Sequence, residues 1–149
     1  MKHNQLVVSI FFYTCLSFLC LFFSIQVLAD SISILTKKGP ISYSVEKANT
    51  VTQQRLGLMY RKSIPSDHGM LFIFDSIRPI SMWMKNTYIP LDMLFVDAKG
   101  IIRHIHENAR PLDETIITCP IPVKYVIELN AGQVGENGIQ IGNEMRIIQ

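Results

Sequence analysis

The chain has 149 residues, a length that suits one domain, and its 14 basic residues nearly balance its 12 acidic ones. Because this near-neutral balance offers no electrostatic footprint for a nucleic acid or an anionic membrane surface, neither is expected as a partner. The GxGxxG and GxxxxGKS/T phosphate-binding motifs and the GxSxG and HExxH hydrolase motifs are all absent. The sequence therefore predicts no cofactor and gives no support for nucleotide chemistry.

The first 29 residues have the pattern of an export signal. Lys2 precedes an uncharged stretch, residues 4–29, that is rich in Leu, Phe, Ile and Val. Its short-chained end suits cleavage by signal peptidase before Asp30, and its length also suits an uncleaved membrane anchor. Both alternatives place residues 30–149 outside the cytoplasm as one exported domain, periplasmic or secreted, with membrane contact only through the N-terminal segment.

Cys119 is the single cysteine of residues 30–149, because Cys15 and Cys20 lie in the N-terminal segment. An internal disulfide framework is therefore excluded for the exported domain. Cys119 is expected to be either buried and inert or a free thiol.

Two short β-favouring runs, Ile32–Leu35 and Ile41–Val45, flank a Gly-Pro turn and predict an opening hairpin. A helix is expected next, capped by Asn49 or Thr50 and continuing to about Tyr60. Gly57 would lie inside this helix, which predicts the close approach of another backbone.

Further apolar runs predict a mainly β domain. Strands are expected at Gly69–Phe74, Ile80–Lys85, Leu91–Ala98, Ile101–Asn108, Val123–Asn130 and Met145–Ile148, with a loop at Arg110–Pro122 and a turn or short helix after Ala131. The strands between Gly69 and Asn108 are expected to form an antiparallel meander. About eight short strands against one principal helix predict an α+β, mainly β fold: a compact antiparallel sheet or a barrel-like domain.

Four sequence blocks, residues 54–61, 69–72, 83–93 and 125–132, resemble the domain of unknown function (DUF) 192 family, also called the UPF 0127 group. The resemblance covers nearly all of residues 30–149. It implies a small β-rich domain, commonly exported in bacteria, with no agreed catalytic residues. One departure is visible, since Gly142-Asn143 stands where the family often has Gly-Asp.

The block around Trp83 offers a candidate ligand site. Strand alternation would place Trp83 and Lys85 on one face and Met82 and Met84 on the other. An aromatic ring beside a cation can form the floor of a pocket for a polar ligand. In the alternative interpretation Trp83 packs in the core, Lys85 lies at the sheet edge, and Asn86 shapes the following turn.

Asp92 is a second candidate because it lies in an otherwise apolar run, where an ionised carboxylate must be paired or hydrogen-bonded. Three roles are open: proton transfer in catalysis, an ion pair with Lys85 or Arg55, or acceptance of backbone N–H groups from the preceding loop.

Glu128 alternates with its apolar neighbours Ile127 and Leu129, so it is expected to face away from them, toward solvent. If Glu128 and Asp92 met across a cleft, the two carboxyl groups would suit acid–base chemistry. Sequence alone does not bring them together.

His104 and His106 lie two residues apart on a predicted strand and therefore on one face, a spacing that can chelate a metal. Two histidines do not complete a site. Soft donors that could join them are Met82, Met84, Met93 and Cys119, although methionines in apolar strands are usually core residues.

These observations favour a non-catalytic ligand-binding or accessory module of the cell envelope, with an unknown small molecule or envelope component as its partner. The candidate ligand-binding residues are Trp83, Lys85, Asn86, Asp92, Arg55 and Glu128. One alternative is a hydrolase or transferase acting on envelope material through Asp92 or Glu128. A second alternative is a metal-handling protein that uses His104 and His106.

Overall fold

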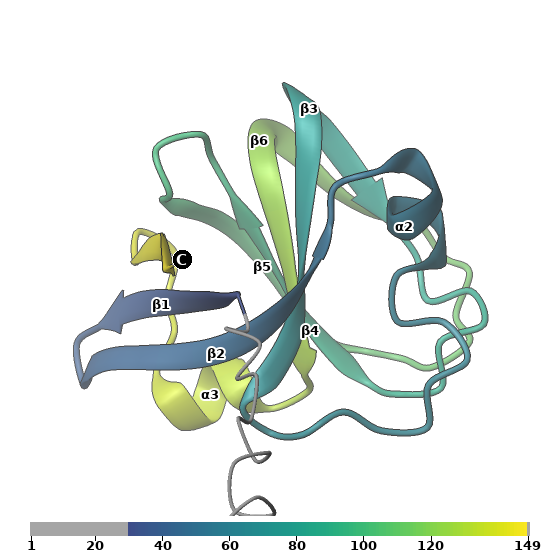
Figure 1. Cartoon of the computed structure of the whole chain (residues 1–149), viewed down its shortest axis with the longest axis horizontal. Helices are drawn as coiled ribbons and strands as arrows, with labels where there is room; N and C mark the ends of the chain where they lie inside the picture. Colours follow the sequence, from purple (N-terminus) through teal and green to yellow (C-terminus); the bar gives the residue numbers. More distant parts are fainter. Residues whose placement is uncertain (1–29, 149) are drawn as a thin grey trace, which may run out of the picture.

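A computed structural model describes residues 30–148. Seven strands and two short helices form this part of the chain: β1 (Ser31–Thr36), β2 (Gly39–Ala48), α2 (Val51–Leu56), β3 (His68–Met82), β4 (Leu91–Val96), β5 (Ile102–Ala109), β6 (Ile117–Asn130), α3 (Gln133–Asn137) and β7 (Glu144–Ile148). The predicted mainly β, barrel-like fold is confirmed (Figure 1).

The seven strands form one curled sheet, a half-barrel, in the order β5-β4-β6-β3-β2-β1-β7. Its two outer strands approach each other, since Ile101 and Glu144 form an isolated antiparallel bridge. The meander expected between Gly69 and Asn108 is wrong, because β6 lies between β3 and β4. All pairs among these seven strands are antiparallel except that of β2 with β3, which is parallel. The parallel pair needs a crossover connection, and this segment contains α2.

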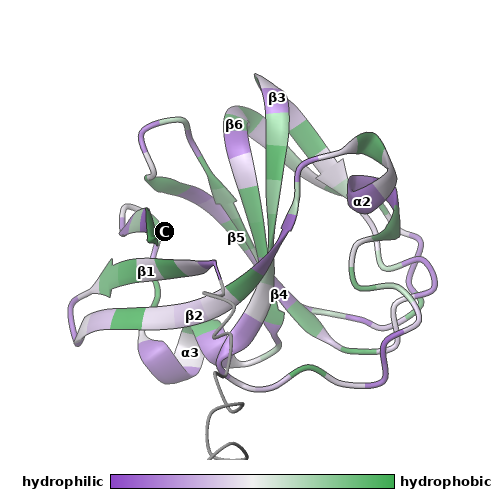
Figure 2. Cartoon of the chain, in the orientation of Figure 1, coloured by the Kyte–Doolittle hydropathy of each residue, from purple (hydrophilic) through white to green (hydrophobic). Residues whose placement is uncertain are grey.

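The central strands β3, β6 and β4 are covered on both faces. In Figure 1, β1, β2 and α3 lie to one side of the central strands, and α2 with the long loops lies to the other. All six residues of β4 are buried, whereas a sheet with one solvated face would alternate between buried and exposed residues. Figure 2 shows the central parts of β3 and β6 mainly in the hydrophobic colour.

Two hydrophobic cores result. The inner core gathers buried residues from all seven strands, from α3 and from the segment after α3: Ile32, Ile34, Tyr43, Val45, Leu71, Leu94, Val96, Ile102, Ile127, Leu129, Val134, Ile139 and Met145. The outer core lies under α2 and the loops and contains Ala48, Leu58, Met70, Phe72, Phe74, Ile80, Met84, Ile89, Leu91, Met93, Phe95, Ala109, Cys119, Val123 and Val126.

Local sequence signals locate several elements correctly. The predicted β1–β2 hairpin forms, but its turn is Lys37-Lys38, because Gly39 and Pro40 already belong to β2. Thr50 caps α2 through a capping box with Gln53. The helix is shorter than expected, however, and ends at Leu56. Gly57 is its C-terminal cap with a φ of 48°, a left-handed value that favours glycine.

Two strand boundaries differ from the prediction. The runs predicted as separate strands at Gly69–Phe74 and Ile80–Lys85 belong to the single strand β3, which bends through register shifts and ends at Met82. The predicted loop at Arg110–Pro122 is half strand, since β6 begins at Ile117. Its prolines fit there because β4 pairs with β6 only from Tyr125 onward, which leaves one edge of this half unpaired.

The predicted signal segment, residues 1–29, lies outside the described residues. Within residues 30–148, no helix has the length and apolar character needed to cross a membrane.

Gly69 tests the packing of β3 against β6. A Cβ atom at this position would lie 2.5 Å from the Glu128 carbonyl oxygen and 2.7 Å from Leu129 Cδ2. We expect Gly69→Ala to lower the free energy of unfolding by about 1–3 kcal/mol, because the paired strands must move apart. Urea denaturation measures the change.

Gly135→Ala in α3 is the matched control. A Cβ atom at Gly135 meets nothing within 4 Å, so this variant should keep or slightly raise stability, by at most about 1 kcal/mol. Equal stability of the two variants would contradict the close packing of β3 and β6.

Candidate functional site

Helix α2 packs over the face of β3 and β6 that carries the outer core, which we call the outer face (Figure 1). The Gln53 side chain accepts hydrogen bonds from the backbone N–H groups of Asn49 and Thr50, at 3.1 and 3.0 Å. The Gln54 side chain donates to the Ile73 carbonyl on β3 at 2.8 Å. The Gln53 bonds cap the short helix, and the Gln54 bond holds it against β3 although none of its own residues is buried.

The helix ends against two side chains of the sheet. A Cβ atom on Gly57 would lie 3.2 Å from Phe72 Cζ and 3.9 Å from Glu128 Oε2. The close approach predicted at Gly57 therefore occurs, but toward side chains of β3 and β6 and not toward a backbone. Because glycine has no side chain, the backbone after α2 can lie close to Phe72 and the Glu128 carboxyl group.

Glu128 lies beneath this turn. On β6 it is the direct cross-strand partner of Met93 on β4 and of Met70 on β3. Its exposed fraction is 4%, and its Oε2 atom is buried without a hydrogen-bond partner among the described residues. The expectation of a solvent-facing Glu128 is wrong, because α2 and the outer core cover the side of β6 that alternation assigned to water.

Burial raises the pKa of the Glu128 carboxyl group from its ordinary value of 4.5 to about 8. An apolar environment disfavours the charged form of a carboxyl group, and no other cause contributes to this shift. Glu128 is therefore mainly protonated at neutral pH.

A small pocket of about 110 Å³ opens beside Glu128, and we call it the α2 pocket. Its walls come from α2 and the following turn, from β3, from the segment after β3 and from β6: Gln54, Arg55, Leu56, Gly57, Leu58, Met59, Phe72, Phe74, Ser81, Met82, Trp83, Thr87 and Glu128. The fold thus brings together three of the candidate residues, Arg55, Trp83 and Glu128.

Trp83 and Lys85 lie in the segment after β3, so the strand predicted to reach Lys85 ends three residues earlier, at Met82, and Asn86 lies in the predicted loop. The Lys85 ammonium group nevertheless lies over the Trp83 ring, with Nζ 5.2 Å from the ring centroid. Asn86 shapes the turn as expected, with a φ of 52°, and its side chain donates to the Tyr60 hydroxyl at 2.9 Å. Trp83 remains 43% exposed at the edge of the α2 pocket.

Asp92 has a structural role on the opposite face of the sheet. It is fully buried, and its two oxygens accept the backbone N–H groups of Asn108 and Val134, each at 2.9 Å. Of the three roles left open by the sequence, the acceptance of backbone N–H groups is the one observed, although these groups belong to later segments and not to the preceding loop. No ion pair with Lys85 or Arg55 is formed. Because α3 has no capping side chain at Gly132, the Asp92 carboxylate acts as the acceptor at its N-terminus.

The two candidate carboxyl groups cannot act on one substrate. Glu128 pairs across the strands with Met93, whereas Asp92 pairs with Leu129, so the two side chains point to opposite faces. Glu128 belongs to the outer face and Asp92 to the inner face. The acid–base pair considered from the sequence is therefore absent.

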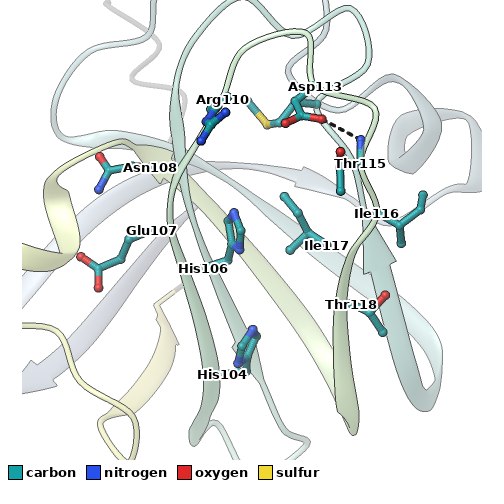
Figure 3. A pocket seen from close by; sticks show the side chains of 11 residues that line it. His104, His106, Glu107, Asn108, Arg110, Asp113, Thr115, Ile116, Ile117 and Thr118 are labelled. Atoms are coloured by element: carbon teal, nitrogen blue, oxygen red, sulfur yellow. Dashed lines mark hydrogen bonds between the residues drawn. The ribbon is translucent and has the colours of Figure 1, made fainter.

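A larger and more polar hollow, of about 510 Å³, lies between β5 and the first part of β6. Figure 3 shows His104 and His106 on one side of β5, as predicted, with Glu107 pointing away on the other side. Across the hollow, Asp113 accepts the backbone N–H of Thr115 at 2.8 Å. No group of three or more His, Cys, Asp or Glu side chains within residues 30–148 has a metal-binding arrangement.

The soft donors suggested for a metal are core residues. Met84, Met93 and Cys119 are buried in the outer core, and Met82 packs against it. Cys119 is a free thiol whose pKa is raised by burial, and it donates to the Ile121 carbonyl oxygen at 3.4 Å. The inert alternative for Cys119 fits these contacts, because a raised pKa keeps the thiolate fraction low.

Residues 33–147 match the model of the DUF192 family, described as Uncharacterized ACR, COG1430. The chain belongs to the DUF192 family. Among curated proteins, none matches its sequence.

Two solved structures are similar to this DUF192 chain. A proposed transcription regulator from Sinorhizobium meliloti is 48% identical with a TM-score of 0.77, and the match covers 79% of this chain and 92% of that chain. A protein of unknown function from Novosphingobium aromaticivorans is 32% identical with a TM-score of 0.76, covering 78% and 83% of the two chains.

The four sequence blocks that carry the DUF192 resemblance meet at the α2 pocket. They supply Gln54 to Met59, Phe72, Trp83 with Thr87, and Glu128. The departure at Gly142-Asn143 lies elsewhere, where the Asn143 side chain accepts the Gln140 backbone N–H at 2.7 Å. An amide oxygen thus makes this turn contact without a carboxylate.

The raised pKa of Glu128 predicts a pH-dependent stability. Between its ordinary pKa of 4.5 and its folded pKa of about 8, the folded state holds a proton at Glu128 that the unfolded state releases. The free energy of unfolding should therefore fall as pH rises through this window, by an amount on the order of a few kcal/mol, and level off above it.

Glu128→Gln removes the titrating group and keeps the shape. We expect the stability difference between Glu128→Gln and the wild type to grow from about pH 5 to about pH 8 in favour of the variant. Urea denaturation across this range measures the difference, and contributions from other carboxyl groups cancel in it. Parallel pH profiles for the two proteins would contradict a protonated Glu128.

Proposed function

We propose that this DUF192 chain is a non-catalytic ligand-binding module and that the α2 pocket is its binding site. The observation that carries the proposal is the buried, unpartnered carboxyl group of Glu128 beside that pocket. The partner is a small molecule, or a small group that projects from a component of the cell envelope.

The free energy cost of Glu128 supports a functional role. A buried polar group without a hydrogen-bond partner destabilises a fold by roughly 1–3 kcal/mol. Most buried polar groups are therefore paired, as Asp92 is in this domain. Unpaired groups with a displaced pKa are typical of sites where a ligand supplies the missing partner.

The surroundings of Glu128 favour binding over turnover. Arg55 is the only other ionisable side chain among the residues that line the α2 pocket. The second carboxyl group that the hydrolase or transferase alternative would use, that of Asp92, is on the opposite face and bonded to backbone N–H groups. The pocket thus has one proton carrier and lacks an acid–base pair.

The larger hollow at His104 and His106 has weaker support as the main site. Its polar side chains are half-buried or exposed, so solvent can satisfy them. Among the described side chains, the buried unpartnered oxygen belongs to Glu128. This difference in the hydrogen bonding of their polar groups favours the smaller α2 pocket as the main ligand site.

Binding can be followed through Trp83, the single tryptophan of the chain. We expect some members of a library of compounds with up to about six non-hydrogen atoms to change its fluorescence and to shift the amide resonances of Gly57 and Phe72, because the pocket holds the volume of about four waters. Protein purified after expression of the full chain is used for both measurements.

Trp83→Ala should weaken the hits about tenfold, judged by the same amide shifts, because the pocket loses an aromatic wall. Leu112→Ala is the control, since Leu112 is 56% exposed and lies outside the α2 pocket. Hits that shift only residues of the His104 and His106 hollow, or no hits, would overturn the proposed site.

The envelope location belongs to the same proposal. It is supported by the apolar segment that follows Lys2 and by the short-chained residues before Asp30. Cleavage predicts a mature chain that begins at Asp30, and mass spectrometry of the protein from a bacterial periplasm measures this. Full-length chain found only in the cytoplasm would contradict export, and a chain retaining Met1 in the membrane fraction would establish the anchor.

A further inference from the structure

The α2 pocket combines a buried acid with basic surroundings. Arg55 lines the pocket and makes no hydrogen bond or ion pair with any residue in the described range. Two further cations lie over its aromatic walls, with Arg78 5.4 Å from the Phe74 ring centroid and Lys85 5.2 Å from that of Trp83. Glu128 is the only carboxyl group among the lining residues.

Glu128 is a hydrogen-bond donor at neutral pH, because its pKa is about 8. Its cross-strand partners are the uncharged Met70 and Met93, and the Phe72 ring and the exposed Arg55 line the same pocket. None of these is an acceptor for the carboxyl proton. A protonated carboxyl group held in an apolar site can donate a strong hydrogen bond to an anionic oxygen.

The size of the pocket limits the bound group. A volume of about 110 Å³ equals that of about four waters, enough for a carboxylate head with a short apolar stem. Leu58, Phe72 and Phe74 provide apolar walls for such a stem.

We propose that the α2 pocket binds a small organic carboxylate, one oxygen of which accepts a hydrogen bond from the Glu128 carboxyl group while its charge faces Arg55. The inference rests on the proposed binding function of this pocket. An organic cation fits the site less well, because it would share the pocket with the positive charge of Arg55 and would require Glu128 to release its proton.

Three probes with the same heavy-atom shape test the charge preference: acetate, acetamide and acetamidinium, which are negative, neutral and positive. We expect acetate to shift the amide resonances of Gly57 and Phe72 at the lowest concentration. Its affinity should fall about 30-fold between about pH 7 and about pH 9.5, because Glu128 ionises and repels the anion.

Three variants separate the contributions. Glu128→Gln keeps an N–H donor that does not titrate, so it should bind acetate within a few-fold of the wild type at neutral pH and lose the pH dependence. Glu128→Leu removes the donor and should abolish the acetate shift. Arg55→Gln should weaken acetate about tenfold, as expected for loss of one charged contact, and leave acetamide unchanged. Circular dichroism checks that each variant is folded.

The outcomes distinguish this inference from the proposed function. Preferential binding of acetamidinium, with an affinity that rises with pH, would overturn the carboxylate and leave the binding pocket in place. Equal binding of acetate by the wild type and Glu128→Leu would also overturn it. If none of the three probes shifts the pocket amides, the carboxylate inference fails, and the library screen with Trp83 then decides the proposed function independently.

Discussion

The burial of β3, β6 and β4 on both faces is the constraint on which the rest of this structure depends. A sheet with one solvent-exposed face packs its apolar side chains into one hydrophobic core, whereas these strands pack theirs into two. The inner core is enclosed by the curling of the sheet itself, with α3 at one end. The outer core has no second sheet to cover it, so a six-residue helix and several loops do so. Such short elements leave part of the outer core uncovered, and the α2 pocket lies at this gap.

The two buried carboxyl groups show how one fold uses the same chemical group in two ways. Asp92 on the inner face accepts two backbone N–H groups and so joins the end of β5 to the start of α3. Glu128 on the outer face has no such partners, and its Oε2 atom is unsatisfied. A carboxylate that accepts backbone hydrogen bonds, as Asp92 does, has a structural role. A buried carboxyl group without such bonds, as in Glu128, is free to bond to a ligand.

Features encoded within a few residues of sequence were predictable. The β1–β2 hairpin follows from the turn signal between its two β-favouring runs, and the start of α2 follows from Thr50 and Gln53. Contacts between residues distant in sequence were not predictable. Alternation along β6 assigns Glu128 to one face of the strand but does not say which segment covers that face. Gly57 was the available signal, since a glycine in a helix-like stretch predicts a close contact but does not name the other residue. The parallel pairing of β2 with β3 likewise depends on the whole sheet and not on either strand.

The pairing of β1 with β7 has a consequence for how the chain completes its fold. Ser31 lies opposite Ile148, so the first and last strands of the domain are neighbours in the sheet. A chain that emerges from a ribosome or a translocation pore in N-to-C order presents β1 and β2 long before β7 is present. Until then β1 has an open edge, which is a template for pairing with other chains. Because synthesis runs from the N-terminus, the pairing of β7 with β1 is a late step in folding. Before that step, a chaperone or rapid release of the whole chain would protect the open edge of β1 from pairing with other copies of the chain.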